Sequence, residues 1–278
     1  MSAETLVRII FVFYAALFGI VIGSFLNVVI YRTPAGKTIA KGHSMCMSCG
    51  HTLAAKDLVP LFSWLFLKGK CRYCGAPIAS RYAKIESLTG LVFLLTALLH
   101  TDTAFVLLLD GTGVFVYMFI YYVLFIIACT AVISSMMIWY DTSKSFLRLS
   151  LIPVATGFIA VFVLSLMSSG GLSFFEISKR LMVWAGSVIV ITLVATIAGM
   201  AVRKSFSMEE IGLDILFAGI FSFSYYLWFA KWYIAVPVIA VSYGLVRALS
   251  SGKAKRYSGI FGAALVIIFM LIVYFINK

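Results

Sequence analysis

Charged residues are scarce in this chain. Only 12% of its 278 residues are Asp, Glu, Lys or Arg, while 63% are hydrophobic and the mean hydropathy is +1.09. Water-soluble globular domains carry about twice that share of charge and fewer apolar residues, so the composition excludes this class. The sequence predicts an all-α polytopic membrane protein.

Other signatures are missing too. The net charge is +12, but the basic residues lie in short loops and form no continuous basic face, so nucleic-acid binding is not expected. The chain lacks a glycine-rich nucleotide fingerprint of the Rossmann kind, and it shows no repeat that would favour an internal-repeat transporter. The first apolar run has no small-residue cleavage site, so we expect it to remain as a membrane span.

Long apolar runs are abundant. A helix needs roughly 20 apolar residues to cross a hydrocarbon core of about 30 Å. The sequence predicts about eight transmembrane helices, at residues 9–31, 85–109, 114–139, 149–168, 181–202, 210–229, 233–249 and 258–277. It divides into a first transmembrane helix at 1–31, a loop domain at 32–84 and a seven-helix domain at 85–278.

Basic residues are distributed unevenly between successive loops. Seventeen of the 22 lie in one set: nine in residues 32–84, two at 144–148, two at 203–204 and four at 247–256. The other five are Arg8, Lys179, Arg180, Lys231 and Lys278. Because cytoplasmic loops are enriched in Lys and Arg, the loop domain is predicted to be cytoplasmic and both termini to lie outside.

Four cysteines form two Cys-x-x-Cys pairs in the loop domain, Cys46/Cys49 and Cys71/Cys74. Two such pairs present four sulfurs to a tetrahedral zinc ion, and a glycine after each pair allows the tight turn of a zinc knuckle. Disulfides are the alternative, which a reducing cytoplasm disfavours. We expect a structural zinc with no open coordination position, and thus no metal catalysis.

An apolar run at residues 58–67 interrupts the loop domain, with Lys68 and Lys70 after it. It is too short to span a bilayer. The run is predicted to lie on membrane lipids at the cytoplasmic interface or to pack under the knuckles, and Trp64 and the lysines favour the lipid contact.

Three acidic residues lie where apolar runs meet the cytoplasmic side: Asp141 at the end of MMIWYD, Asp214 inside GLDILFAGIF, and Glu86. Ionisable residues at membrane depth are costly and often functional. If Asp141 and Asp214 come together, one can keep its proton while the other acts as a base, as in aspartic peptidases. Helix capping or contact with the interface is the alternative for each.

Residues 20–95 resemble a known family. GSFLNVVIYR (Gly23 to Arg32), the two knuckles CMSC and CRYC, and GAPIASRYAKIESLTG (Gly75 to Gly90) are similar to the N-terminal region of prepilin peptidases. The resemblance implies a bacterial inner-membrane enzyme. It would cleave the basic leader of type IV pilin-like precursors and then methylate the new amino terminus with S-adenosylmethionine.

The resemblance also implies functional residues. The family's catalytic aspartates map onto Asp141 and Asp214, but the family motif Gly-x-Gly-Asp reads Ile211-Gly212-Leu213-Asp214 here, with Leu213 in place of the glycine before Asp. Glycine there would loosen the helix and let the backbone approach substrate.

For the methyl donor, the polar residues to consider are Asn27, Arg32 and Glu86. Each has a structural alternative: a hydrogen bond between spans for Asn27, contact with lipid headgroups for Arg32, and pairing with nearby basic residues for Glu86.

Two rival functions stay open. One is an inactive scaffold that binds precursors, which the altered motif favours, and the other is a transporter with a regulatory zinc ribbon.

Overall fold

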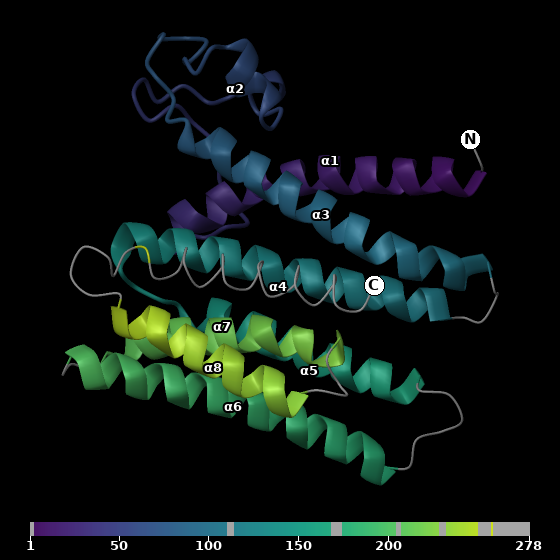
Figure 1. Cartoon of the computed structure of the whole chain (residues 1–278). Helices are drawn as coiled ribbons and strands as arrows, with labels where there is room; N and C mark the ends of the chain where they lie inside the picture. Colours follow the sequence, from purple (N-terminus) through teal and green to yellow (C-terminus); the bar gives the residue numbers. More distant parts are fainter. Residues whose placement is uncertain are drawn as a thin grey trace. The chain divides into compact units, whose positions relative to one another are not determined.

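The computed structural model describes residues 3–109, 114–167, 174–203, 207–227, 232–249 and 257, and no β-strand is assigned within these ranges. The elements are α1 (Ala3–Arg32), a 3₁₀ turn η1 (Ala55–Asp57), α2 (Phe62–Phe66), α3 (Arg81–Leu109), α4 (Val114–Thr142), α5 (Leu147–Met167), α6 (Phe174–Arg203), α7 (Met208–Leu227) and α8 (Trp232–Leu249) (Figure 1). The prediction of a helical protein is confirmed.

Seven of the eight predicted spans fall on long helices, and the run at 258–277 lies outside the described residues. Among the described residues, three helical stretches are long and apolar enough to cross a membrane: Thr5–Arg32, Phe119–Thr142 and Phe175–Ala201. Shorter apolar stretches lie in α5 (Leu147–Val163) and α8 (Pro237–Val246). The count of eight spans stays a prediction.

The chain forms two compact units, Met1–Asp102 and Thr103–Lys278. In the first, α1 and α3 pack closely at glycines of α1. A methyl group added to Gly19 would lie 2.7 Å from the Phe93 side chain, and one added to Gly23 would lie 2.7 Å from the Cα atom of Glu86. Only residues without a side chain permit this approach.

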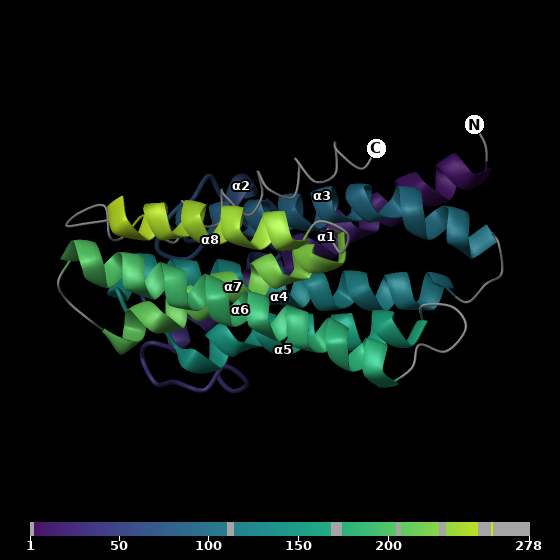
Figure 2. The ribbon, with the colours of Figure 1, turned by 60° about the horizontal axis from the view of Figure 1, so that its bottom comes forward.

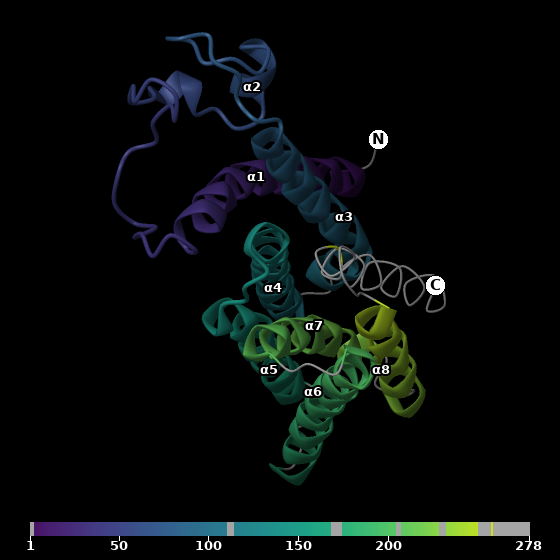
Figure 3. The same ribbon diagram turned by 90° about the vertical axis from the view of Figure 1, so that its left-hand side faces the viewer.

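In the second unit, α7 packs against α4, α5 and α6, and α8 packs against α6 (Figure 2, Figure 3). Its buried core includes Trp139, Leu213, Phe217, Phe221 and Tyr243. The α5–α7 contact again depends on glycine, because a methyl group at Gly219 would lie 2.8 Å from the backbone nitrogen of Val154.

Candidate functional site

The two cysteine pairs form two knuckles with the same backbone pattern. In the first, Cys46 N–H donates to His51 O and Gly50 N–H donates to Cys46 O, each at 2.9 Å. In the second, Cys71 N–H donates to Ala76 O at 2.8 Å and Gly75 N–H donates to Cys71 O at 2.9 Å. Both glycines have positive φ, 70° and 71°, which closes each turn without steric cost.

The four sulfur atoms converge. All four lie within 4.8 Å of one another, and Cys46 Sγ is 3.9 Å from Cys74 Sγ. A tetrahedral site with Zn–S bonds of about 2.3 Å places its sulfurs about 3.8 Å apart. The donor set and the spacing therefore fit a zinc ion. All four thiols are free, so the disulfide alternative is not the arrangement found.

The thiols of the cluster differ in acidity. The backbone N–H groups of Cys49 and Ser48 stabilise the Cys46 thiolate and lower its pKa to about 6. The Ala76 N–H favours the Cys74 thiolate, but desolvation and the neighbouring cysteine sulfurs outweigh it and raise the pKa of Cys74 to about 11. If all four cysteines bind as thiolates, their negative charges would repel one another, and a divalent cation would relieve that repulsion.

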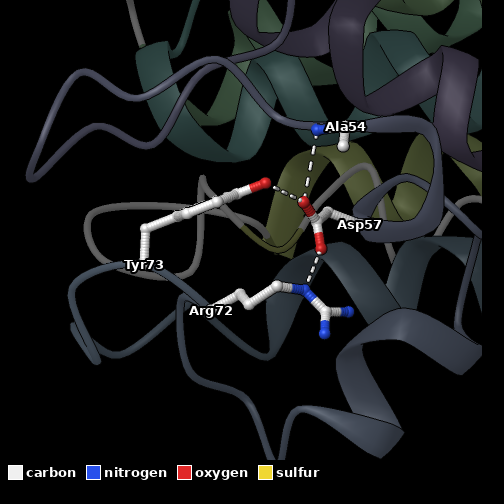
Figure 4. Close-up of polar contacts among 4 residues, drawn as sticks. All are labelled: Ala54, Asp57, Arg72 and Tyr73. Carbon is white, nitrogen blue, oxygen red and sulfur yellow. Dashed lines mark hydrogen bonds and ion pairs between the residues drawn. The ribbon is translucent and has the colours of Figure 1, made fainter.

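A second polar cluster holds the loop domain together (Figure 4). Asp57 of η1 accepts hydrogen bonds from Arg72 Nε at 2.5 Å and from Tyr73 OH at 2.9 Å, both in the second knuckle. The Arg72 guanidinium holds the pKa of Asp57 below its ordinary value of 3.8. Tyr73 also packs on the His51 ring of the first knuckle, with ring centroids 3.7 Å apart. Asp57 and Tyr73 thus connect η1 to both knuckles.

The apolar run has one side chain that packs into the loop domain and several that are exposed, and lipid contact stays a prediction. Trp64 Nε1 donates to Ile78 O at 3.1 Å, so this side chain packs into the loop domain. Phe66 of α2 is 82% exposed, and Leu58, Val59, Phe62 and Leu65 are exposed as well. These five residues are called the α2 patch below.

Two of the three residues considered for the methyl donor lie together. Glu86 is only 7% exposed, its Oε2 accepts from Leu61 N–H at 2.6 Å, and Ser24 and Asn27 also hydrogen bond to its carboxyl group. Asn27 Nδ2 in addition donates to Tyr82 O at 3.2 Å, which is the bond between helices considered above.

Arg32 lies at the end of α1 and binds elsewhere in the same unit. Its guanidinium donates to Thr38 O at 3.1 Å, Lys41 O at 2.6 Å and Gly42 O at 3.4 Å, and so it holds the loop that follows α1. The polar groups of Asn27, Arg32 and Glu86 thus hydrogen bond within the fold, and their role toward a methyl donor stays a prediction.

Asp214 is fully buried, with no exposed surface. Its Oδ2 accepts from Thr196 Oγ1 of α6 at 3.2 Å, and its Oδ1 accepts from Tyr243 OH of α8 at 3.1 Å. Burial of a carboxyl group is costly without such partners. Neither Thr196 nor Tyr243 belongs to a recognisable motif, and sequence reasoning missed both.

Asp141 lies exposed near the end of α4, followed by Ser143 with a positive φ of 54°. The segment after it contacts the start of α7, because Ser145 Oγ donates to Glu209 O at 2.5 Å. Gly212 faces this segment: a methyl group there would clash with the Ser145 side chain.

Asp214 is two residues after Gly212, about 200° around the helix. Its hydrogen bonds to Thr196 and Tyr243 point its side chain toward α6 and α8. The pairing of Asp141 with Asp214 stays a prediction.

Leu213 does not interrupt α7. The helix is continuous from Met208 to Leu227, and Leu213 is buried in the core of the second unit. The glycine that allows close approach here is Gly212, which lies against Ser145 and Ser150.

The N-terminal part of the chain is similar to known proteins. Residues 17–100 match the family model of the bacterial peptidase A24 N-terminal domain. A prepilin leader peptidase/N-methyltransferase of Myxococcus xanthus is 48% identical over 84 residues, which is 30% of this chain and 25% of that protein. A type 4 prepilin-like proteins leader peptide-processing enzyme of Escherichia coli is 39% identical over 107 residues, 32% of this chain and 40% of the relative.

A prepilin leader peptidase/N-methyltransferase of Dichelobacter nodosus is 36% identical over 118 residues, 33% of this chain and 41% of the relative. The chain thus spans between a quarter and about two fifths of the length of these relatives. No solved structure matches it. The family model ends at residue 100, so Asp141 and Asp214 lie outside it, whereas the four cysteines, Asn27, Arg32 and Glu86 lie inside. Over residues 17–100, the chain is therefore similar to the N-terminal domain of bacterial A24 peptidases and to the corresponding part of prepilin leader peptidases.

Proposed function

We propose that this chain is a prepilin leader peptidase and N-methyltransferase of the bacterial inner membrane. It would cleave the basic leader of type IV pilin-like precursors at the cytoplasmic boundary and then methylate the new amino terminus. The observation that carries the proposal is the match of residues 17–100, which includes both knuckles and the helices on either side of them.

The proposed zinc ion has a structural role. Cys46, Cys49, Cys71 and Cys74 supply four sulfur ligands, which complete a tetrahedral site. Metal binding would stabilise the folded loop domain, because the two knuckles contribute one pair of ligands each.

Asp141 and Asp214 are the proposed catalytic pair of an aspartic peptidase. One carboxylate removes a proton from water as the water attacks the scissile carbonyl carbon, and the other, protonated, donates its proton to the carbonyl oxygen. As the C–N bond breaks, the first carboxyl group passes the proton taken from water to the leaving amine, and the hydroxyl group of the intermediate returns its proton to the second. Two interacting carboxyl groups titrate as a pair, so the roles of acid and base are not divided between Asp141 and Asp214. Asp214 is buried away from bulk water, which supports a carboxyl group that can keep its proton.

The loop domain is proposed to face the cytoplasm and to contact membrane lipids through the α2 patch. The exposed apolar side chains and the following lysines Lys68 and Lys70 favour contact with the acyl region and with anionic headgroups. A basic leader would then stay on the same side as this domain.

Methylation needs a methyl donor, proposed to be S-adenosylmethionine, which carries a transferable methyl group on sulfur. Asn27, Arg32 and Glu86 stay candidates for its site. Their described contacts are within the chain, so no step of the reaction is assigned to them.

Cleavage of a pilin precursor tests the proposal. Membranes with wild type, Asp141→Asn or Asp214→Asn are incubated with a basic-leader precursor, and the mass of the product's amino terminus is measured. Wild type should remove the leader and add 14 Da for a methyl group, whereas both variants should lose cleavage.

Methylation of a substrate that already lacks its leader provides the control. The two Asp variants should still methylate it, since the carboxylate pair acts in hydrolysis. If wild type leaves the precursor intact while membranes of an active relative cleave it, the peptidase proposal is wrong and the scaffold alternative, based on Leu213, takes its place.

A further inference from the structure

The hydrogen bonds to Asp214 assign a role to two residues on other helices. We infer that Thr196 and Tyr243 are positioning residues that hold the Asp214 carboxyl group for peptide hydrolysis. The inference rests on the proposed function, since it presupposes that Asp214 takes part in catalysis.

Thr196 behaves differently from other threonines of the described helices. Thr192 donates to Val188 O and Thr156 to Ile152 O, each at 2.8 Å, four residues back along its own helix. Such bonds satisfy a hydroxyl within an apolar bundle without involving another helix. Thr196, one turn after Thr192 on α6, instead donates across to Asp214 of α7.

The position of Tyr243 is fixed by the packing of its ring. It is fully buried, and its ring packs on Phe217 and Phe221 of α7, with centroids 5.1 Å and 6.1 Å away. Asp214, Phe217 and Phe221 follow one another at spacings of three and four residues, so they lie on one face of α7. The Tyr243 ring therefore lies along this face of α7, and its hydroxyl group donates to Asp214 on the same face.

The two donors act on different oxygens of the same carboxyl group. Thr196 binds Oδ2 from α6, and Tyr243 binds Oδ1 from α8. Two bonds, one to each oxygen, fix the plane of the carboxyl group as well as its place. Proton transfer depends steeply on such orientation, so loss of either bond should slow the chemical step more than substrate binding.

Variants of nearly unchanged shape test the inference. Thr196→Val and Tyr243→Phe remove one hydroxyl each and keep the packing volume, whereas Thr196→Ser keeps the hydroxyl. Thr192→Val is the matched control. It removes a hydroxyl group one turn away on the same helix, and in the described contacts that hydroxyl donates only to the backbone of α6. Each purified full-length protein is assayed with a pilin precursor over a range of concentrations, and its thermal midpoint is recorded.

Thr196→Val and Tyr243→Phe should each lower kcat about ten-fold or more with KM within about two-fold, since a carboxyl group that has lost one of its two donors is poorly oriented for proton transfer. Thr196→Ser should recover most of kcat, and Thr192→Val should match wild type. If Tyr243→Phe fails to fold, the Val and Ser variants at position 196 decide the matter.

Wild-type values of kcat in both Thr196→Val and Tyr243→Phe would overturn the inference. Cleavage by the wild-type protein would still support the proposed function in that case. A rise in KM alone would also overturn the inference, because that result belongs to substrate binding. If wild type itself does not cleave, the proposed function fails and this inference fails with it.

Discussion

Leu61 donates its backbone N–H to Glu86 Oε2 at 2.6 Å, across 25 positions of the sequence. Leu61 is the centre of a tight turn, with φ of 62° and ψ of −52°, in which Phe62 N–H donates to Pro60 O at 2.7 Å. This conformation is rare and strained for a residue with a side chain, so surrounding contacts must hold it. The buried carboxylate of Glu86 supplies one of them and connects the start of α2 to α3.

We predict that Glu86→Ala loosens α2 while zinc stays bound. The Leu61 N–H would lose its acceptor, and a partly buried donor left without a partner costs about 1–3 kcal/mol. Hydrogen exchange of peptides covering residues 58–68 should speed up by about ten-fold or more. Glu86→Gln should show a smaller effect because its amide oxygen can still accept. Unchanged exchange in Glu86→Ala would contradict the role assigned to this bond.

Metal analysis should find about one zinc per chain in the wild-type protein. Cys71→Ser, which removes the buried ligand of the cluster, should reduce zinc to less than about a tenth of that, because three sulfurs do not complete a structural site. Cys129→Ser is the control, since this cysteine lies on α4, outside the cluster. Equal zinc in Cys71→Ser and wild type would show that the metal is held elsewhere.

Two glycine-to-alanine substitutions should have opposite effects. At Gly219 the new methyl group would lie 2.8 Å from Val154 N and 2.9 Å from Pro153 Cβ, so α5 and α7 must separate, at a cost of about 1–3 kcal/mol. At Gly186 of α6 no atom lies within 4 Å of the new methyl group, and alanine should stabilise the helix by about 0.5–1 kcal/mol. Thermal unfolding in detergent measures both. Equal midpoints for the two variants would count against the close α5–α7 contact.

The α2 patch should contact lipid. With the photoreactive residue p-benzoylphenylalanine in place of Phe66, irradiation in vesicles of anionic phospholipid should give protein–lipid adducts, detected by mass. The same residue in place of Trp64 should give none, because Trp64 packs into the loop domain. Protein–protein adducts at position 66 in place of lipid adducts would indicate that another protein covers the patch.

Sequence reasoning predicted the helical membrane class and most helix positions, because both depend on local properties. A run of about 20 apolar residues predicts a helix wherever it lies. Seven predicted runs fall on helices that begin or end within a few residues of the expected positions, such as α1, predicted at 9–31 and found at Ala3–Arg32. The four cysteines were likewise assigned to one cluster because the spacing within each pair already forms a knuckle.

Contacts between distant residues could not be read from the sequence. Asn27 of α1 and Glu86 of α3 come together because the two helices pack closely at Gly23. Similarly, Asp214 was singled out by its cost in an apolar segment, but its partners Thr196 and Tyr243 look like ordinary residues of apolar helices. The composition and spacing of this chain thus determined its class, its helices and its cysteine cluster. Tertiary packing alone decided which hydroxyl groups reach Asp214 and which backbone N–H reaches Glu86, because each depends on the rotation of one helix against another.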